Sequence, residues 1–310
     1  MKQNLNIHPD LKWLAKIKPK TNSWLQMVIL NFVFRLSIIF YRPPKNVKKR
    51  YFQIPGQKTT IILLSKKKQT PHKKALLFFH GGGFQNVGTM VHLKMMTAFL
   101  NDERQTAIYV KYRLAPKYPF PYALEQGYAA YLWLLENADR LDIDPNQIAV
   151  AGDSAGGHLA IGLTMLVRDR LQRQMEKLLL IYPVIDDRQE TASMKEFTDT
   201  PMWNAQLNHH MWSLYLPDRN HEMIRYARFL DADLTGFPET YIETAEYDCL
   251  RDEGLLFGER LKQTGIPVVI NETKQTVHGY DAAFYSPFVK EIIQKRSAFL
   301  KGENNEKDQR

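Results

Sequence analysis

The amino-acid sequence predicts an α/β fold, with a mostly parallel central sheet flanked by helices and a helical cap. Short, continuous apolar runs recur along the chain, as strands buried on both faces of a sheet require. Helical patterns lie between these runs, and such alternation is typical of a parallel sheet. We predict strands at 60–64, 75–79, 107–110, 148–151, 178–182, 240–244 and 267–270, and helices at 122–136, 156–172, 252–263 and 287–299.

Composition excludes several classes of protein. The chain has 310 residues, of which 44% are hydrophobic and 24% charged, so it can form a core and is neither collagenous nor disordered. Its single cysteine excludes an intrachain disulfide framework and a cysteine-based zinc finger. With no cysteine pair and no cleavable leader pattern, we predict a cytoplasmic location.

Charge is distributed unevenly. Residues 1–74 contain 17 Lys and Arg and one acid, whereas the other 236 residues contain 25 basic and 32 acidic residues. Such a basic arm favours nucleic acid, an anionic membrane surface or a solvated face. No nucleic-acid-binding module accompanies it, so we predict no nucleic-acid partner. Peripheral contact with a membrane surface remains an alternative. It would use a basic face near the pocket, formed in part by residues 48–50 and 66–68.

The most apolar stretch, 24–41, predicts a helix that Pro43 and Pro44 bring to an end. Its eighteen residues are close to the minimum for a membrane span, but Arg35 near the centre argues against a simple span. Asn31, Arg35 and Arg42 share one stripe at 100° per residue. We predict a helix buried on most sides by the protein's own body, with membrane contact as the alternative and a secretory signal least favoured.

Ser154 is the candidate nucleophile. It lies in Gly-Asp-Ser-Ala-Gly (152–156), after a predicted strand and before a predicted helix. That context is typical of a nucleophile elbow, where the serine Oγ projects from a strained turn. Residues two before and two after the serine crowd each other, so Gly152 and Gly156 have to be small. Asp153 belongs to the same turn.

A glycine run, His80-Gly81-Gly82-Gly83, directly follows the predicted strand 75–79. Backbone N–H groups of such a loop can stabilise the oxyanion of an acyl transfer. A phosphate-binding loop needs G-x-x-x-x-G-K-[ST] and a dinucleotide site needs G-x-G-x-x-G, and neither pattern is present. We therefore predict an oxyanion loop at 80–83.

His278 is the candidate base, because it follows the last strand at the edge where catalytic groups gather in open α/β sheets. Asp248, just beyond the strand 240–244, is the candidate acid that orients the imidazole, with Glu246 as the alternative. We expect His158 to pack in the core. The remaining histidines after Ser154 lie in the predicted cap: His209, His210 and His221.

Four blocks together resemble the hormone-sensitive-lipase-like branch of the α/β-hydrolases, which includes bacterial carboxylesterases and arylacetamide deacetylase. They are 80–84, 112–121 (YRLAPKYPFP), 152–157, and 248–254 followed by His278-Gly279. The resemblance covers residues 60–300. It implies an α/β-hydrolase fold, a catalytic triad of Ser154, Asp248 and His278, and oxyanion donors from Gly82, Gly83 and Ala155.

Two positions depart from the family pattern. Cys249 stands where the family usually has proline, and Tyr280 stands where phenylalanine is common. A cysteine beside the acid leads us to expect activity that is sensitive to thiol reagents. The resemblance also implies a cap made of the N-terminal segment and an insertion. We therefore expect a cap segment at 1–50, a catalytic domain at 51–185 and 238–302, an inserted helical cap at 186–237 and a polar tail at 303–310.

Together these residues predict a serine carboxylesterase that cleaves short- to medium-chain acyl esters of small molecules. The reaction needs no metal and no organic cofactor. Hydrolysis of amides by the same triad is the main alternative. A non-catalytic binding protein is less favoured, because the related plant gibberellin receptors have lost the histidine that His278 supplies here. A dehydratase is disfavoured because the plant enzymes of that kind carry threonine at the position of Ser154. A homodimer stays open.

Overall fold

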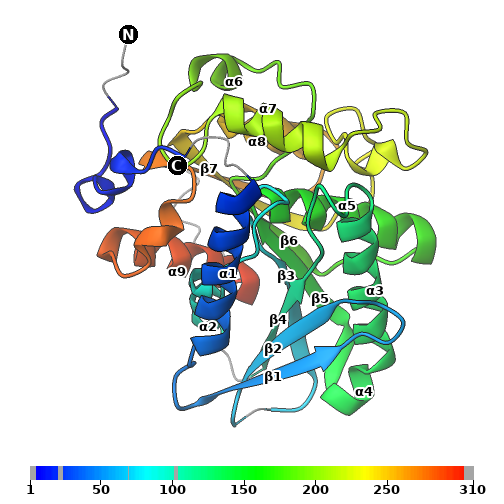
Figure 1. The fold of residues 1–310 in the computed structure, drawn as a ribbon. Helices are drawn as coiled ribbons and strands as arrows, with labels where there is room; N and C mark the ends of the chain where they lie inside the picture. Colours follow the sequence, from blue (N-terminus) through cyan, green and yellow to red (C-terminus); the bar gives the residue numbers. More distant parts are fainter. Residues whose placement is uncertain (1–4, 20–23, 69, 101–103, 304–310) are drawn as a thin grey trace.

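Eight strands form one sheet in the order β1-β2-β4-β3-β5-β6-β7-β8 in the computed structural model, which describes residues 5–19, 24–68, 70–100 and 104–303 (Figure 1). The β1–β2 and β2–β4 pairs are antiparallel and the other five pairs are parallel, which confirms the mostly parallel sheet. Residues 304–310 of the expected polar tail lie outside the described residues. The strands are β1 (Val47–Gln53), β2 (Thr60–Lys66), β3 (Lys73–Phe79), β4 (Gln105–Lys111), β5 (Ile143–Asp153), β6 (Lys177–Ile181), β7 (Glu239–Tyr247) and β8 (Val268–Val277).

Helices cover both faces of the sheet (Figure 1). Alternate residues of β3 point to opposite sides, so that Leu77 and Phe79 join one core and Leu76 and Phe78 the other. The first core packs against α3, α5 and α8, and the second against α1, α2 and α9. The helices are α1 (Trp24–Phe40), α2 (Met90–Phe99), α3 (Tyr122–Glu136), α4 (Ala138–Leu141), α5 (Ala155–Leu171), α6 (Ala192–Glu196), α7 (Ala205–Tyr215), α8 (Arg251–Gln263) and α9 (Pro287–Lys301).

The sequence analysis did not assign β1 as a strand or α2 as a helix. The strand β1 pairs only with β2 at the sheet edge and alternates mostly between exposed and half-buried residues, so it lacks a continuous apolar run. Helix α2 follows the glycine loop and begins at the N-cap Thr89, whose side chain and that of His92 form a capping box. Neither element has the apolar pattern on which the strand and helix predictions are based.

Helix α1 packs on the body along one side only, contrary to the expectation of burial on most sides. Asn31 faces inward, where its Nδ2 donates to Gln85 O at 3.0 Å and its Oδ1 accepts from Val87 N at 2.7 Å. Ile38 is buried in the same interface, and the amine of Lys49 donates to Ile38 O and Tyr41 O at the helix end. No helix in the described ranges is long and apolar enough to cross a bilayer.

Lys66 to Lys68 do not lie near the carboxyl edge of the sheet, where we expected one basic face. Thr60 pairs with Lys111 at the carboxyl end of β4, and Ser65 pairs with Thr106 at its amino end. The register therefore carries Lys66 and the residues after it to the opposite edge. Only the beginning of β2 approaches the edge where the parallel strands end.

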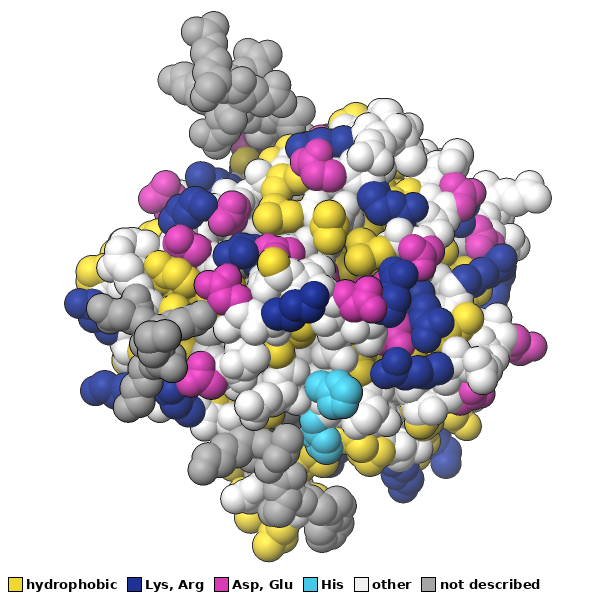
Figure 2. Space-filling model, turned by 90° about the horizontal axis from the view of Figure 1, so that it is seen from above, with side chains coloured by type: hydrophobic (Ala, Val, Ile, Leu, Met, Phe, Trp, Pro, Cys, Tyr) yellow, Lys and Arg dark blue, Asp and Glu magenta, His cyan; other side chains and the backbone are white. Residues whose placement is uncertain are grey.

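Residues 186–237 lie above the carboxyl ends of the parallel strands (Figure 1). They include α6, α7 and a short 3₁₀ helix at Ile224–Tyr226, and they contain no strand. Trp212 and Tyr215 of α7 pack in the first core, which joins this segment to the body. Seen from above in Figure 2, the surface of the molecule mixes cationic and anionic side chains.

Candidate active site

Ser154 occupies a sharp turn between β5 and α5. Its φ and ψ are 53° and −121°, a region that non-glycine residues rarely adopt, so the surrounding structure has to hold it there. A Cβ on Gly156 would collide with the carbonyl of Phe79, and one on Gly152 would collide with the carbonyl of Gly156. The glycines on both sides are therefore needed for the turn to pass so close to β3.

Three chain segments bring Ser154, His278 and Asp248 together at the carboxyl edge of the sheet. Asp248 follows β7 and His278 follows β8. His278 Nε2 lies 2.9 Å from Ser154 Oγ, and His278 Nδ1 lies 2.6 Å from Asp248 Oδ2. A carboxylate only accepts, so Nδ1 carries the proton and Nε2 is left to accept from the serine hydroxyl. All three side chains are buried.

Asp248 is held in place by its own loop, since its Oδ1 accepts from Leu250 N at 3.0 Å. Glu246, the alternative acid, instead accepts from Gln275 N at 2.6 Å. It has no hydrogen bond with His278 in the part of the chain that the structure describes. The geometry therefore favours Asp248 over Glu246.

The glycine loop after β3 lies beside the serine. Gly82 has a φ of +114°, which is accessible mainly to glycine. Among the described residues, neither Gly82 nor Gly83 donates its backbone N–H to a protein acceptor. Ala155 begins α5, so its N–H is one of the unpaired donors of a helix N-terminus. These three N–H groups are free to bind an anionic oxygen.

Asp153 holds the glycine loop in place through a hydrogen bond. Its Oδ1 accepts from Gly81 N at 3.0 Å, and its Oδ2 lies 3.3 Å from His92 Nε2. Burial alone would lower the pKa of His92, but the charge and hydrogen bond of Asp153 raise it above its usual value. The two groups therefore form a largely buried ion pair. The sequence analysis missed His92; the Thr89-x-x-His92 capping pattern was the one feature that could have drawn attention to it.

His80, the first residue of the loop, is a structural support. Burial and the nearby charge of His92 lower its pKa to about 3, so it is neutral. Its ring stacks on Tyr112 at 4.2 Å between centroids, and the Tyr112 hydroxyl donates to His80 O at 2.6 Å. His158, predicted to pack, lies in an aromatic cluster with Phe84 and Trp212, and burial likewise lowers its pKa to about 3.

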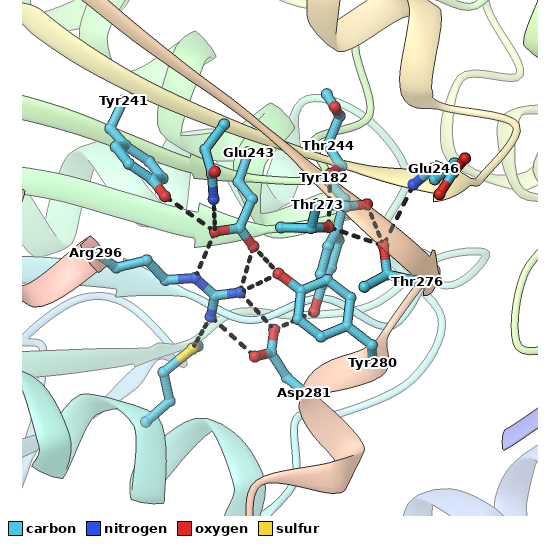
Figure 3. Close-up of polar contacts among 12 residues, drawn as sticks. Tyr182, Tyr241, Glu243, Thr244, Glu246, Thr273, Thr276, Tyr280, Asp281 and Arg296 are labelled. Atoms are coloured by element: carbon cyan, nitrogen blue, oxygen red, sulfur yellow. Dashed lines mark hydrogen bonds and ion pairs between the residues drawn. The ribbon is translucent and has the colours of Figure 1, made fainter. Parts of the chain in front are cut away.

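A buried polar network around Arg296 joins β7 and the residues after β8 to α9 (Figure 3). The Arg296 guanidinium is fully buried between the carboxylates of Glu243 and Asp281, and Tyr280 donates its hydroxyl to Glu243. Tyr182 donates to Asp281 Oδ2 at 2.6 Å, and its ring lies 4.6 Å from the His278 ring. The hydroxyl that distinguishes Tyr280 from phenylalanine is therefore used inside this network.

Cys249 is fully buried, contrary to the expectation of a reactive thiol beside the acid. Burial raises the pKa of its thiol well above the usual value, and the neighbouring charges of Asp248 and Glu253 act in the same direction. A neutral, inaccessible thiol reacts poorly. Thiol reagents should therefore leave the native protein unmodified at this position.

A cavity of about 290 Å³ lies over Ser154 and His278. Met27, Leu30 and Phe34 of α1 form one wall, and Trp203 and Leu207 of the segment 186–237 form another. A larger cavity of about 780 Å³ lies at the outer edge of β8 and contains none of the catalytic candidates. The smaller cavity is the relevant one, because it joins the serine to an apolar lining.

Comparison with known proteins agrees with the fold. Residues 76–282 match the family model described as the alpha/beta hydrolase fold. The carboxylesterase NlhH of Mycobacterium tuberculosis is 34% identical over 226 residues, 71% of each chain. Arylacetamide deacetylase of Oryctolagus cuniculus is 30% identical over 230 residues, 54% of this chain and 58% of its own. The solved structure of a bacterial heroin esterase has a TM-score of 0.85 at 28% identity, covering 96% of this chain and 98% of that one.

Proposed function

The chain belongs to the α/β-hydrolase family, in its hormone-sensitive-lipase-like branch, and from this premise we propose that it hydrolyses carboxylic esters through Ser154, His278 and Asp248. One observation carries the proposal: His278 lies within hydrogen-bond distance of both Ser154 Oγ, at 2.9 Å, and Asp248 Oδ2, at 2.6 Å. This is the relay that a serine nucleophile requires.

In the proposed reaction, Ser154 Oγ attacks the ester carbonyl while His278 Nε2 takes the hydroxyl proton. The negative charge that forms on the carbonyl oxygen is stabilised by the N–H groups of Gly82, Gly83 and Ala155. His278 then donates its proton to the leaving alcohol, and an acyl group remains on Ser154. A water molecule, deprotonated by His278, releases the acid and restores the serine. Asp248 holds the imidazole in the tautomer that each step requires.

The cavity supports a substrate of limited size. Its volume of about 290 Å³ is at the lower end of the range of about 300–1,000 Å³ for small-molecule sites. Its lining from α1 and from Trp203 and Leu207 is apolar. Both properties favour short- to medium-chain acyl groups over long ones. A hydrolysis series over p-nitrophenyl esters of increasing acyl length tests this, and an optimum at a long chain would contradict it.

The experiment for the triad is the substitution Ser154→Ala. Hydrolysis of p-nitrophenyl butyrate should fall to background, because the nucleophile is lost while the fold is retained. Ser213→Ala is a matched control, because Ser213 is exposed on α7 and its hydroxyl donates to His210 O within the same helix. Retained turnover in Ser154→Ala, with an unchanged circular dichroism spectrum, would rule out the assignment.

Amide hydrolysis is the second candidate, favoured by the similarity to a protein named arylacetamide deacetylase. The same serine, histidine and acid would act, and His278 would protonate a leaving amine in place of an alcohol. Parallel assays with phenyl acetate and acetanilide distinguish the two substrates. A ratio of kcat/KM values that favours the anilide would make the amide the better description.

A further inference from the structure

Helix α1 turns an apolar face to solvent. Seven of its large apolar side chains have exposed fractions between 45% and 72%. At 3.6 residues per turn they fall within a sector of about 140°. A contiguous exposed apolar patch of this kind marks an interaction site rather than ordinary surface. This α1 outer face consists of Leu25, Val28, Ile29, Phe32, Val33, Ile39 and Phe40.

A cation-lined groove of about 640 Å³ adjoins this face, between α1, the beginning of β2, the end of β4 and the loop that follows it. Among the described residues that line the groove there is no Asp or Glu, and the sequence has none from residue 11 to residue 101. The cations are Arg35, Lys58, Lys111, Arg113 and Lys117.

Several of these cations lack a side-chain partner among the described residues. Neither Arg35 nor Lys111 forms a hydrogen bond or ion pair within the part of the chain that the structure describes. Burial, together with the like charges of Arg35 and Lys49, lowers the pKa of Lys111. Repulsion among like charges is relieved when an anion binds between them. The groove therefore carries positive charge that the described residues around it do not neutralise, and an anion would bind there favourably.

The α1 outer face and the groove are continuous. Val28 and Ile39 belong to the exposed face and also line the groove, and Met27 lines both the groove and the catalytic cavity. Leu30 and Phe34, on the inner side of α1, line the catalytic cavity alone. One helix therefore separates the cavity over Ser154 from an apolar surface bordered by cations.

We propose that the α1 outer face and the cation-lined groove dock the protein on an anionic phospholipid surface, with α1 lying in the plane of the interface. The apolar side chains would enter the acyl boundary while Arg35 and Lys111 meet the phosphates. The helix has 17 residues, about 25 Å, which is shorter than a hydrocarbon core of about 30 Å, so it lies on the membrane rather than across it.

A second copy of the chain is a poorer occupant of this surface. A twofold contact brings the same surface patch of both copies into one interface. That interface would gather the cations of both grooves, and the sequence from 11 to 101 supplies no carboxylate to balance them. Anionic headgroups supply the opposite charge, together with an apolar phase for Phe32 and Ile29.

The experiment is co-sedimentation of the full chain with vesicles. Vesicles of equal parts phosphatidylcholine and phosphatidylglycerol should bind the protein, phosphatidylcholine alone should bind it far more weakly, and added salt should release it. Because each cation near such a surface is worth about fivefold in affinity, Arg35→Gln with Lys111→Gln should weaken binding about 25-fold. Phe32→Ser with Ile29→Ser should abolish sedimentation, because the apolar contact is lost.

Matched controls separate docking from overall charge and folding. Lys67→Gln with Lys68→Gln removes the same charge at the opposite edge of the sheet and should leave binding nearly unchanged. Leu256→Ser removes an exposed apolar side chain of α8, 49% exposed, and should also bind normally. Ser154→Ala should bind like the wild type, so loss of hydrolysis and loss of docking are distinguishable.

Three results would overturn the proposal. The first is no sedimentation with the anionic vesicles. The second is an equal loss of binding in the Lys67/Lys68 variant and in the Arg35/Lys111 variant. The third is a wild-type dimer, measured by light scattering, that becomes a monomer in Phe32→Ser, because the occupant would then be a second copy of the chain.

Discussion

The catalytic edge of the sheet and helix α1 differ in whether their charged and apolar side chains find partners inside the protein. At the catalytic edge, the buried carboxylates of Asp153 and Asp248 each have a histidine partner within the chain. Helix α1 leaves an apolar face in solvent beside Arg35 and Lys111, which have no ion-pair partner among the residues that the structure describes. The upper surface in Figure 2 resembles neither, since it mixes both signs of charge. The charged groups of the first region are paired within the molecule, whereas the second region offers a surface that suits an external partner.

Asp248→Asn should have the largest effect, because it removes the carboxylate partner of His278 at the catalytic edge. An amide can donate to Nδ1 and stabilise the wrong tautomer of His278, so kcat for p-nitrophenyl butyrate should fall on the order of 10⁴-fold. Glu246→Gln is the control, because Glu246 accepts from Gln275 N and, within the described ranges, forms no hydrogen bond with His278. Equal losses in the two variants would show that the loop, rather than the relay, had been damaged.

Arg296→Met tests the buried network that supports His278. The substitution leaves Glu243 and Asp281 buried without their cation, and breaking a buried pair in this way costs about 3–5 kcal/mol. The control is Lys262→Met on α8, whose pair with Glu259 is exposed and should contribute about 1 kcal/mol or less. Urea unfolding followed by fluorescence measures both. The interpretation fails if the two variants are equally stable.

Glu253→Gln should change stability with a defined pH dependence. Glu253 is buried, and burial raises its pKa from 4.5 to about 8. In the unfolded chain it ionises near pH 4.5, so the folded state loses stability as the pH rises from there to about 8. The variant lacks this loss. Its free energy of unfolding relative to the wild type should therefore rise between pH 5 and pH 9 by a few kcal/mol, on the order expected from the pKa shift. A difference that stays constant with pH would contradict the shift.

The central strands could be predicted from the sequence because each is buried on both faces and reads as a continuous apolar run. The edge strand β1 could not, because water covers part of it and its sequence, VKKRYFQ, is largely polar. Ser154, Asp248 and His278 were predicted as site residues because each follows a strand, and parallel strands end at one edge. That positional argument needs no knowledge of packing.

Contacts between distant, unpatterned residues were not predictable. Arg296 meets Glu243 across 53 positions of sequence, and only the packing of α9 on the sheet brings them together. His92 reaches Asp153 from α2, a helix that the sequence analysis did not assign. The direction of α1 was also beyond reach, since periodicity shows that an apolar stripe exists but not which side faces the body. Here the two hydrogen bonds of Asn31 turn that residue toward the body, whereas Arg35 of the same stripe stays exposed.

The smallest expected effect concerns the outer face of α1. Phe32 is 60% exposed, so Phe32→Ala should change the free energy of unfolding by no more than about 0.5 kcal/mol, as expected for surface positions. Ile38, on the inner side of the same helix, is 3% exposed, and Ile38→Ala should cost about 2–5 kcal/mol. Urea titration of both variants in the absence of lipid gives the comparison. If Phe32→Ala were as destabilising as Ile38→Ala, the outer face would be satisfied within the folded chain, and the contrast between α1 and the catalytic edge would disappear. If Phe32 contributes little to folding, the apolar side chains of this face stay available for a contact outside the molecule.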